Sequence, residues 1–228
     1  MKIYDRAGAP NTARVRIVLA AKGLEDKVDF VSIDLIGAQQ KSDTYLAKDP
    51  IGKIPLLELD DGTMISESTA ITEYLDYLDG NPLLTGKTPR EKGVIHMMQR
   101  RVEQLVMEPI DDYFHNGTRG LGAALTSWRM PEWKGRREWG ELRGAFATRN
   151  LPHFNRVLER QPFLAGDTFS MPDITLYAFR LFTDLLNFPV ATDFKALAAW
   201  RARVEELPAV KNRSGKELLA EDLARLTA

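Results

Sequence analysis

Residues 53–71 constrain the fold of this chain more than any other stretch. Two short apolar runs, residues 54–59 and 63–65, flank the turn Asp60-Asp61-Gly62, whose glycine can take a positive φ at little cost. Apolar runs on either side of Asp-Gly predict a β-hairpin. Over residues 69–78, apolar side chains then recur at positions i, i+3, i+4 and i+7, which predicts a helix directly after the hairpin.

The junction between the hairpin and this helix is a candidate ligand site. A helix start leaves backbone N–H groups unpaired and carries a partial positive charge, so it can hold a carboxylate, and the Ser68 hydroxyl would add a donor. Pro55 stands at the expected start of the first strand, and the Ile54-Pro55 bond is a candidate for the cis form. A cis bond would turn the Ile54 backbone toward a peptide-like ligand. An ordinary hairpin closed by a serine-rich turn is the alternative.

Composition narrows the possible functions. The chain has 228 residues, of which 44% are hydrophobic, enough for a sizeable core. A net charge of -1 provides no basic field for nucleic acid or an anionic membrane. Cysteine is absent, which excludes disulfides, zinc–thiolate sites and a protein thiol nucleophile, so thiol chemistry would need a thiol supplied by a ligand. Because no apolar run has the length of a membrane span and residues 1–5 lack a signal-peptide core, we expect a cytoplasmic protein.

Two further site types receive little support. His96, His115 and His153 are far apart and show no metal-ligand spacing, so we expect no metal. Residues 117–122 contain glycines but lack the GxGxxG order and a preceding strand, so a nucleotide-binding loop is not expected.

The order of predicted elements divides the chain in two. Residues 1–80 are predicted as β-α-β, a short helix and then β-β-α, which is the order of a thioredoxin-like fold. Residues 81–89 contain Gly and Pro and predict a linker. Residues 90–228 predict an α-helical bundle, so the fold class is α/β plus all-α. Within it, residues 117–135 have no clear period and are interpreted as a bent connection beside a cleft.

Three motifs resemble the cytosolic glutathione transferase family. Ile54-Pro55 followed by Glu67-Ser68 is similar to its glutathione-binding half, and residues 11–16 resemble the start of its first helix. Residues 170–174 resemble the capping box of its helical domain, a folding element in which Ser170 and Asp173 satisfy backbone groups. The resemblance covers most of the chain and implies a detoxification enzyme that conjugates reduced glutathione, its co-substrate, to a hydrophobic electrophile.

Other functions fit the same resemblance. Bound glutathione could instead reduce small disulfides or organic hydroperoxides, which relatives with Asn or Thr at the first helix start suggest. A non-catalytic binding module with the glutathione transferase fold is the third possibility.

The resemblance also implies which residues act on sulfur. A free thiol with a pKa of about 8.5 is mostly protonated at neutral pH, so the site must favour the thiolate. Pro10-Asn11-Thr12 resembles the bacterial relatives of this kind, including the nu class, and makes Asn11 and Thr12 the candidate donors. Asn11 as a simple helix cap is one alternative. Tyr4 is another candidate for the sulfur contact, although its place in an apolar strand favours burial.

The remaining assignments also follow from the resemblance. The Ile54 backbone, before Pro55, would pair with the cysteinyl peptide, while Glu67 and Ser68 would bind the γ-glutamyl amine and carboxylate. Candidates for the glycyl carboxylate are Gln40 and Lys53, with Lys41 as a substitute. Candidates for the electrophile site are Met107, Tyr113, Phe114 and Trp128, although helical spacing makes core positions the commoner role. We expect a homodimer, in which Glu103 or Gln104 could complete the neighbouring subunit's site.

Overall fold

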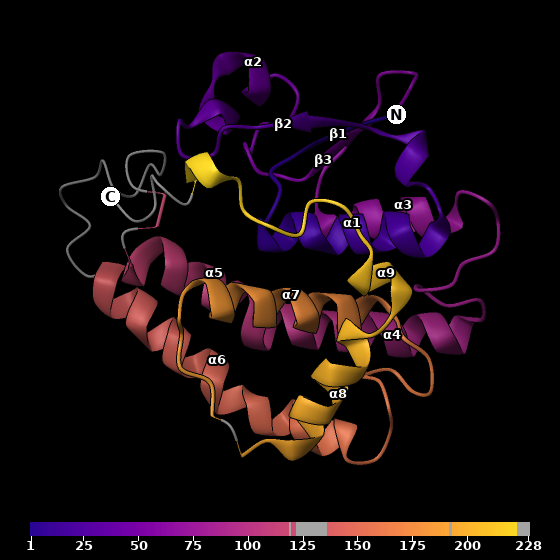
Figure 1. The fold of residues 1–228 in the computed structure, drawn as a ribbon, viewed down its shortest axis with the longest axis vertical. Helices are drawn as coiled ribbons and strands as arrows, with labels where there is room; N and C mark the ends of the chain where they lie inside the picture. Colours follow the sequence, from indigo (N-terminus) through magenta and orange to yellow (C-terminus); the bar gives the residue numbers. More distant parts are fainter. Residues whose placement is uncertain (119, 122–135, 192, 223–228) are drawn as a thin grey trace.

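A computed structural model describes residues 1–118, 120–121, 136–191 and 193–222. Its amino-terminal half contains one small sheet with helices packed against it (Figure 1). The elements are β1 (Lys2–Asp5), α1 (Pro10–Lys22), β2 (Asp29–Ser32), α2 (Asp43–Leu46), β3 (Leu56–Glu58), β4 (Met64–Ile65) and α3 (Ser68–Tyr77). The sheet order is β2-β1-β3-β4, in which β1 and β2 are parallel and the other pairs are antiparallel. This is the thioredoxin-like arrangement that the sequence predicts.

The predicted hairpin is present but shorter than expected. Leu57 pairs with Ile65 and Glu58 pairs with Met64. The Ile54-Pro55 bond is cis, and both residues precede β3 rather than forming its first positions. Since proline has no N–H to donate to the ladder, pairing with β1 begins at Leu56.

Helix α1 begins and ends where its sequence signals lie. Pro10 occupies the first turn, where its missing N–H has no intrahelical role. Gly23 closes the helix in the left-handed conformation with φ 62°, and the Leu24 N–H donates to the Leu19 carbonyl at 2.8 Å. This places Asn11 in the first turn of α1.

The carboxyl-terminal half is helical. Its elements are α4 (Pro89–Val102), a π-helical segment (Glu103–Met107), α5 (Glu108–Asp112), a second π-helical segment (Tyr113–Gly117), α6 (Arg136–Leu158), α7 (Met171–Leu185), α8 (Lys195–Glu205) and α9 (Pro208–Lys211). Figure 1 shows α7 running beside α4, with α1 and α3 above this pair. The two π-helical segments interrupt the long helix that the sequence predicts from residue 90. Most of the predicted connection over residues 117–135 lies outside the described residues.

The cap of α7 is built as the sequence predicts and does more than predicted. The Ser170 N–H and hydroxyl both donate to Asp173 Oδ2 at 3.2 Å. Asp173 Oδ1 also accepts from the Leu164 N–H and from Trp200 Nε1, each at 2.9 Å. Burial raises the pKa of Asp173 to about 6, against the opposing effect of these hydrogen bonds. This carboxylate therefore ties α7 to α8 inside the core.

The end of the described chain returns to the amino-terminal half, where it appears in yellow in Figure 1. Arg6 donates to both carboxylate oxygens of Asp222, at 2.7 and 2.8 Å, and both side chains are about 95% buried. The Gly8 N–H donates to the Gly215 carbonyl at 3.0 Å. The returning segment thus covers the loop that leads into α1. The predicted helical bundle extends to residue 228, and its last residues, 223–228, lie outside the described residues.

Within the described part of the chain, no helix combines the length and apolar character needed to cross a membrane. In the same ranges, no three acidic or histidine side chains are grouped so that they could hold a metal ion.

Candidate active site

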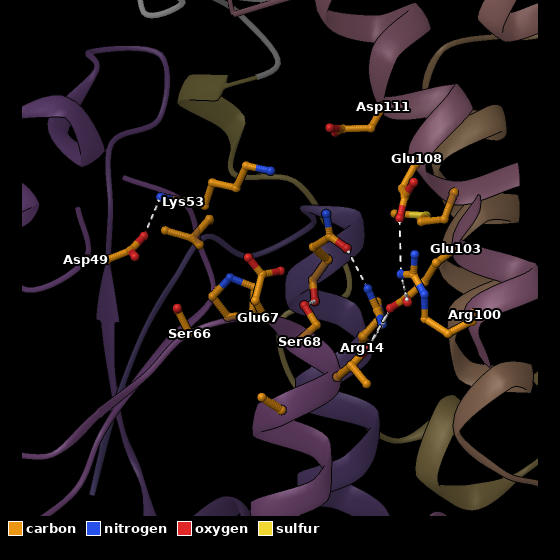
Figure 2. Close-up of a pocket in the computed structure, with 16 residues that line it drawn as sticks. Arg14, Asp49, Lys53, Ser66, Glu67, Ser68, Arg100, Glu103, Glu108 and Asp111 are labelled. Carbon is orange, nitrogen blue, oxygen red and sulfur yellow. Dashed lines mark hydrogen bonds and ion pairs between the residues drawn. The ribbon is translucent and has the colours of Figure 1, made fainter. Parts of the chain in front are cut away.

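A cavity of about 610 Å³ lies between the amino-terminal half and the helical segment that runs from α4 into α5. Figure 2 shows its charged side chains pointing in from both walls. The cavity is lined by Asn11, Arg14, Asp49, Lys53, Ile54, Pro55, Ser66, Glu67, Ser68, Thr69, Ala70, Arg100, Glu103, Met107, Glu108 and Asp111. Twelve of these sixteen residues carry polar or charged side chains, so the cavity can hold a polar, charged ligand.

The start of α3 forms the floor on the amino-terminal side. Glu67 precedes the helix with φ 68° and ψ 118°, a backbone conformation that residues other than glycine seldom adopt. This turn directs Ser66, Glu67 and Ser68 into the cavity (Figure 2). The first backbone N–H groups of α3 have no partners within the helix, so this end can hold an anion.

Asn11 and Arg14 bring the first turn of α1 to the same cavity. Arg14 Nη1 donates to Asn11 Oδ1 at 3.2 Å, and Arg14 Nη2 donates to Thr69 Oγ1 at 2.9 Å and to Glu103 Oε1 at 3.1 Å. Burial alone would raise the pKa of Glu103, but the hydrogen bond from Thr69 and the charge of Arg14 outweigh it and lower that pKa. Glu103 is therefore held as a carboxylate inside the cavity wall.

Lys53 and Asp49 form the other end of the amino-terminal wall. The Lys53 backbone N–H donates to Asp49 Oδ2 at 2.9 Å, which fixes the chain immediately before Ile54. The Lys53 side chain extends toward the opposite wall, where Asp111 also points into the cavity (Figure 2). Burial would raise the pKa of Asp111, but the hydrogen bond with His115 and the charges of His115 and Lys53 lower it.

The helical wall is charged along its length. Arg100 Nη1 donates to Glu103 Oε2 at 2.8 Å and to Glu108 Oε1 at 3.3 Å. Met107 is the apolar member of this wall among the described lining residues and is 3% exposed. The wall therefore offers one apolar contact surrounded by an ion-pair network.

Comparison with known proteins agrees with this geometry. Residues 3–83 match the family model described as glutathione S-transferase, N-terminal domain, and residues 145–208 match the one described as glutathione S-transferase, C-terminal domain. Glutathione S-transferase 2 of Saccharomyces cerevisiae is 46% identical over 211 residues, which are 92% of this chain and 88% of that protein. The chain belongs to the glutathione S-transferase family.

Solved structures of glutathione S-transferases share the fold over nearly the whole chain. The structure of Gtt2 from Saccharomyces cerevisiae matches with a TM-score of 0.85 and 45% identity, covering 93% of this chain and 99% of that one. A glutathione S-transferase domain-containing protein from Marinobacter aquaeolei matches with a TM-score of 0.86 and 43% identity, covering 92% of this chain and all of the other. The family fold predicted from the sequence is confirmed.

Within this glutathione S-transferase, the cavity gathers most of the residues that the sequence suggests for glutathione. Those that line it are Asn11, Lys53, Ile54, Pro55, Glu67 and Ser68, and Met107, a candidate for the electrophile site, lines it as well. Thr12 does not line it, because its side chain is 1% exposed and its hydroxyl accepts from the Arg6 N–H at 3.4 Å. Gln40 does not line it either, because its side chain is buried and its Nε2 donates to the Leu35 carbonyl at 3.3 Å.

The alternative candidates are engaged elsewhere. The Tyr4 hydroxyl donates to Glu58, which also accepts from Lys48 Nζ at 3.0 Å, so Tyr4 does not line the cavity. Lys41 Nζ donates to the Ile51 carbonyl at 2.8 Å.

Two aromatic candidates for the electrophile site, Tyr113 and Phe114, do not line this cavity. Tyr113 packs edge-on against Phe188, with ring centroids 4.7 Å apart, and lines a separate cavity of about 470 Å³. Phe114 packs against Phe182 at 5.2 Å. Trp128 lies outside the described residues.

Sequence reasoning missed several charged residues of the site, above all Arg14. The sequence motifs assign no role in the site to Arg14. The available signal was the spacing of Asn11 and Arg14, because residues three apart lie on one face of a helix.

Proposed function

We propose that the cavity binds reduced glutathione and that the protein transfers its sulfur to an electrophile, as a glutathione transferase. The observation that carries this proposal is the convergence of three elements on one cavity: the start of α3 at Ser68, the Ile54 backbone before cis-Pro55, and the Asn11 side chain. These offer an anion site, peptide groups and a neutral donor, which are the three features needed by a tripeptide thiol.

Charge complementarity supports the orientation of the tripeptide. The Glu67 carboxylate suits the γ-glutamyl amine, and the Ser68 hydroxyl with the α3 backbone N–H groups suits the γ-glutamyl carboxylate. Lys53, at the other end of the wall, suits the glycyl carboxylate. In this orientation the cysteinyl residue lies along Ile54, and its sulfur is directed toward the first turn of α1.

The chemistry required of the site is electrostatic. Lowering a thiol pKa by about two units requires roughly 2.7 kcal/mol of preference for the thiolate. A hydrogen bond to a charged group contributes roughly 1.5–3 kcal/mol, so the Asn11 amide with the nearby helix start suffices. In the proposed reaction the thiol proton first passes to water. The thiolate then forms the C–S bond, and the leaving group departs with the electron pair of the bond that breaks.

The test combines turnover with binding. We expect Asn11→Ala to lower kcat for conjugation of a model aryl halide at least about tenfold, a loss of about 1.4 kcal/mol in the transition state, while calorimetry shows nearly unchanged glutathione affinity. We expect Ser68→Ala to weaken affinity by about 1–2 kcal/mol, because it removes a partner of a charged group. Absence of heat when reduced glutathione is titrated into the wild-type protein would reject the proposal.

Thr12 is tested separately, as Thr12→Val. Its buried hydroxyl supports the loop before α1, so we expect a loss of stability together with a smaller loss of turnover than for Asn11→Ala. Consumption of NADPH in a coupled glutathione reductase assay with a disulfide or hydroperoxide, without aryl halide conjugation, would favour the reductase alternative.

We also propose that the protein forms a homodimer and acts in the cytoplasm. Leu78, Leu83 and Met97 are large apolar side chains that are 43–49% exposed, which supports an interface on the side of α3 and α4. Glu103 has both carboxylate oxygens engaged within its own chain, so Gln104 is the better candidate for reaching the neighbouring subunit. Light scattering on the eluted protein tests the dimer, and a monomeric mass would reject it.

A further inference from the structure

Arg14 joins three elements around the sulfur end of the cavity. Its guanidinium bonds Asn11 on its own helix, Thr69 on α3 and Glu103 at the end of α4. The side chain is 7% exposed, and Thr69 and Gln99 also donate to Glu103 Oε1, at 2.6 and 2.8 Å. Arg14 is therefore fixed by the fold and cannot swing into the cavity without breaking these contacts.

The chemistry of the two partners sets the direction of the Asn11 amide. A guanidinium has donors and no acceptor, so the Asn11 atom that faces Arg14 must be the carbonyl oxygen Oδ1. The two N–H bonds of the amide then project from the other side of the planar group. Because Asn11 lines the cavity, this side is available to a ligand.

We propose that Arg14 is a positioning residue that holds the Asn11 amide with its NH₂ group toward the bound glutathione sulfur. The inference rests on the proposed function and deepens it. An unrestrained amide could present either end to the cavity, and its oxygen would repel a thiolate while its N–H groups stabilise one. By binding the oxygen, Arg14 removes the unfavourable orientation and leaves two donors for sulfur.

Arg14 acts on sulfur through Asn11 rather than by its own charge. The charged groups that face it are Glu103 from the helical wall and Glu67 from the turn before α3, and Arg100 on α4 shares Glu103. The Glu103 carboxylate lies 3.1 Å from Arg14 Nη2, and its negative charge offsets most of the electrostatic potential that the guanidinium would create at the sulfur position. A direct effect of the Arg14 charge on the sulfur would persist without Asn11, whereas an effect through the Asn11 amide would not. An experiment with and without Asn11 therefore distinguishes the two.

The experiment measures the thiol pKa of bound glutathione from the ultraviolet absorbance of the thiolate as pH is varied. Arg14→Lys keeps the charge but replaces two terminal nitrogens with one, so it cannot reproduce the separate bonds of Nη1 to Asn11 and of Nη2 to Thr69 and Glu103. We expect Arg14→Lys to raise the thiol pKa of bound glutathione by about one unit, so that at a pH below the pKa the thiolate fraction is about tenfold lower than in the wild type. Glutathione affinity should stay within about threefold of the wild-type value. Arg16→Lys is the matched control, because Arg16 is an equally buried arginine on α1 that pairs with Asp5, away from the cavity. It should leave the thiol pKa unchanged.

A double-mutant cycle tests the route through Asn11. Asn11→Ala should raise the thiol pKa by itself, and adding Arg14→Lys should then change it by less than about 0.3 units, because the amide to be oriented is gone. An undiminished Arg14→Lys effect in the Asn11→Ala background would mean that Arg14 acts directly, and the inference would be wrong.

A second variant keeps the inference testable if Arg14→Lys does not fold. Asn11→Asp retains the oxygen that faces Arg14 and replaces the NH₂ group with a second oxygen. We expect its thiol pKa to exceed that of Asn11→Ala, since an anion would then face the sulfur. A value equal to or below that of Asn11→Ala would overturn the proposed orientation. Glutathione that binds none of these proteins, wild type included, would instead reject the proposed function.

Discussion

Asp76, near the end of α3, is expected to be the most sensitive single residue for the docking of the two halves. It is fully buried, and its Oδ1 accepts from the Leu83 N–H at 2.9 Å. Its Oδ2 accepts from the N–H of Leu84 at 2.9 Å and from the N–H and hydroxyl of Thr85 at 2.8 and 2.7 Å. One carboxylate thus holds the connector that leads from the sheet-bearing half to α4.

The expected cost of Asp76→Ala follows from the donors it leaves behind. Leu84 and Thr85 are at most 3% exposed, so two backbone N–H groups would remain buried without partners. Each such group costs about 1–3 kcal/mol, which gives about 2–6 kcal/mol of destabilisation in total. Because folded domains are stable by only about 5–15 kcal/mol, this loss is a large fraction of the total. Asp76→Asn keeps one oxygen and should lose less.

Urea unfolding followed by circular dichroism measures this loss as a lower midpoint at an unchanged slope. The matched control is Asp79→Ala, because Asp79 lies three residues further along, is exposed, and shares the partner Lys22. Its removal should lower the midpoint much less. Equal midpoints for the two variants would show that the Asp76 hydrogen bonds do not hold the connector, and the reasoning would fail.

Two further predictions concern residues outside the cavity. Asp222→Ala removes the main partner of the buried Arg6 guanidinium but leaves Glu221 and Ser32 bonded to it, so we expect about 1.5–3 kcal/mol of destabilisation in urea unfolding. A loss below about 0.5 kcal/mol would contradict the role of this ion pair. Tyr4→Phe should leave conjugation rates unchanged, because the Tyr4 hydroxyl donates to Glu58 outside the cavity, and a tenfold loss of kcat would return Tyr4 to the reaction. Hydrogen bonds from Tyr4 and Lys48 lower the pKa of Glu58 to about 2. Since this folded pKa lies below the unfolded value of 4.5, Glu58 stabilises the fold above pH 4.5, and that contribution is lost as pH falls toward 2. Carboxyl NMR titration of Tyr4→Phe should show a higher Glu58 pKa than in the wild type. As pH falls, the stabilising contribution of Glu58 should therefore be lost at a higher pH.

Local sequence signals were sufficient wherever a few neighbouring residues decide the backbone. The hairpin follows from an Asp-Gly turn between apolar runs, the end of α1 follows from Gly23, and the start of α7 follows from Ser170 and Asp173. These features depend on φ preferences and on hydrogen bonds within about four residues. The start of β3 was less predictable, because it is set by pairing with β1, whose residue Tyr4 lies opposite Leu56.

The site was predictable only where a motif fixes the backbone. Glu67 and Ser68, at the turn before α3, and Ile54 and Pro55, before β3, all line the cavity. The role of Arg14 could not be predicted in this way. Its partners Thr69 and Glu103 are 55 and 89 residues further along the chain, and a long side chain meets them only after three helices have packed.

The helical wall shows how register decides which side chain meets the second substrate. Residues 100, 103, 107 and 111 follow one stripe of the α4–α5 helix, and Phe114 would continue it in a regular α-helix. Residues Tyr113–Gly117 are π-helical instead, and Phe114 packs against Phe182 rather than lining the cavity. Met107 is left as the apolar contact of the described wall.

Met107→Ala should therefore reduce kcat/KM for a bulky aromatic electrophile at least about tenfold, because one lost apolar contact of methylene size in a pocket is worth roughly 1–3 kcal/mol. The reduction in kcat/KM should be smaller for a small polar electrophile, because such a substrate contacts Arg100 and Glu108 more than it contacts the Met107 thioether. Phe114→Leu is the control, since it changes an aromatic ring of the neighbouring turn that packs away from the cavity. If Phe114→Leu alters the ratio of the two kcat/KM values and Met107→Ala does not, the stripe is assigned to the wrong face, and the electrophile must enter from the side of Tyr113.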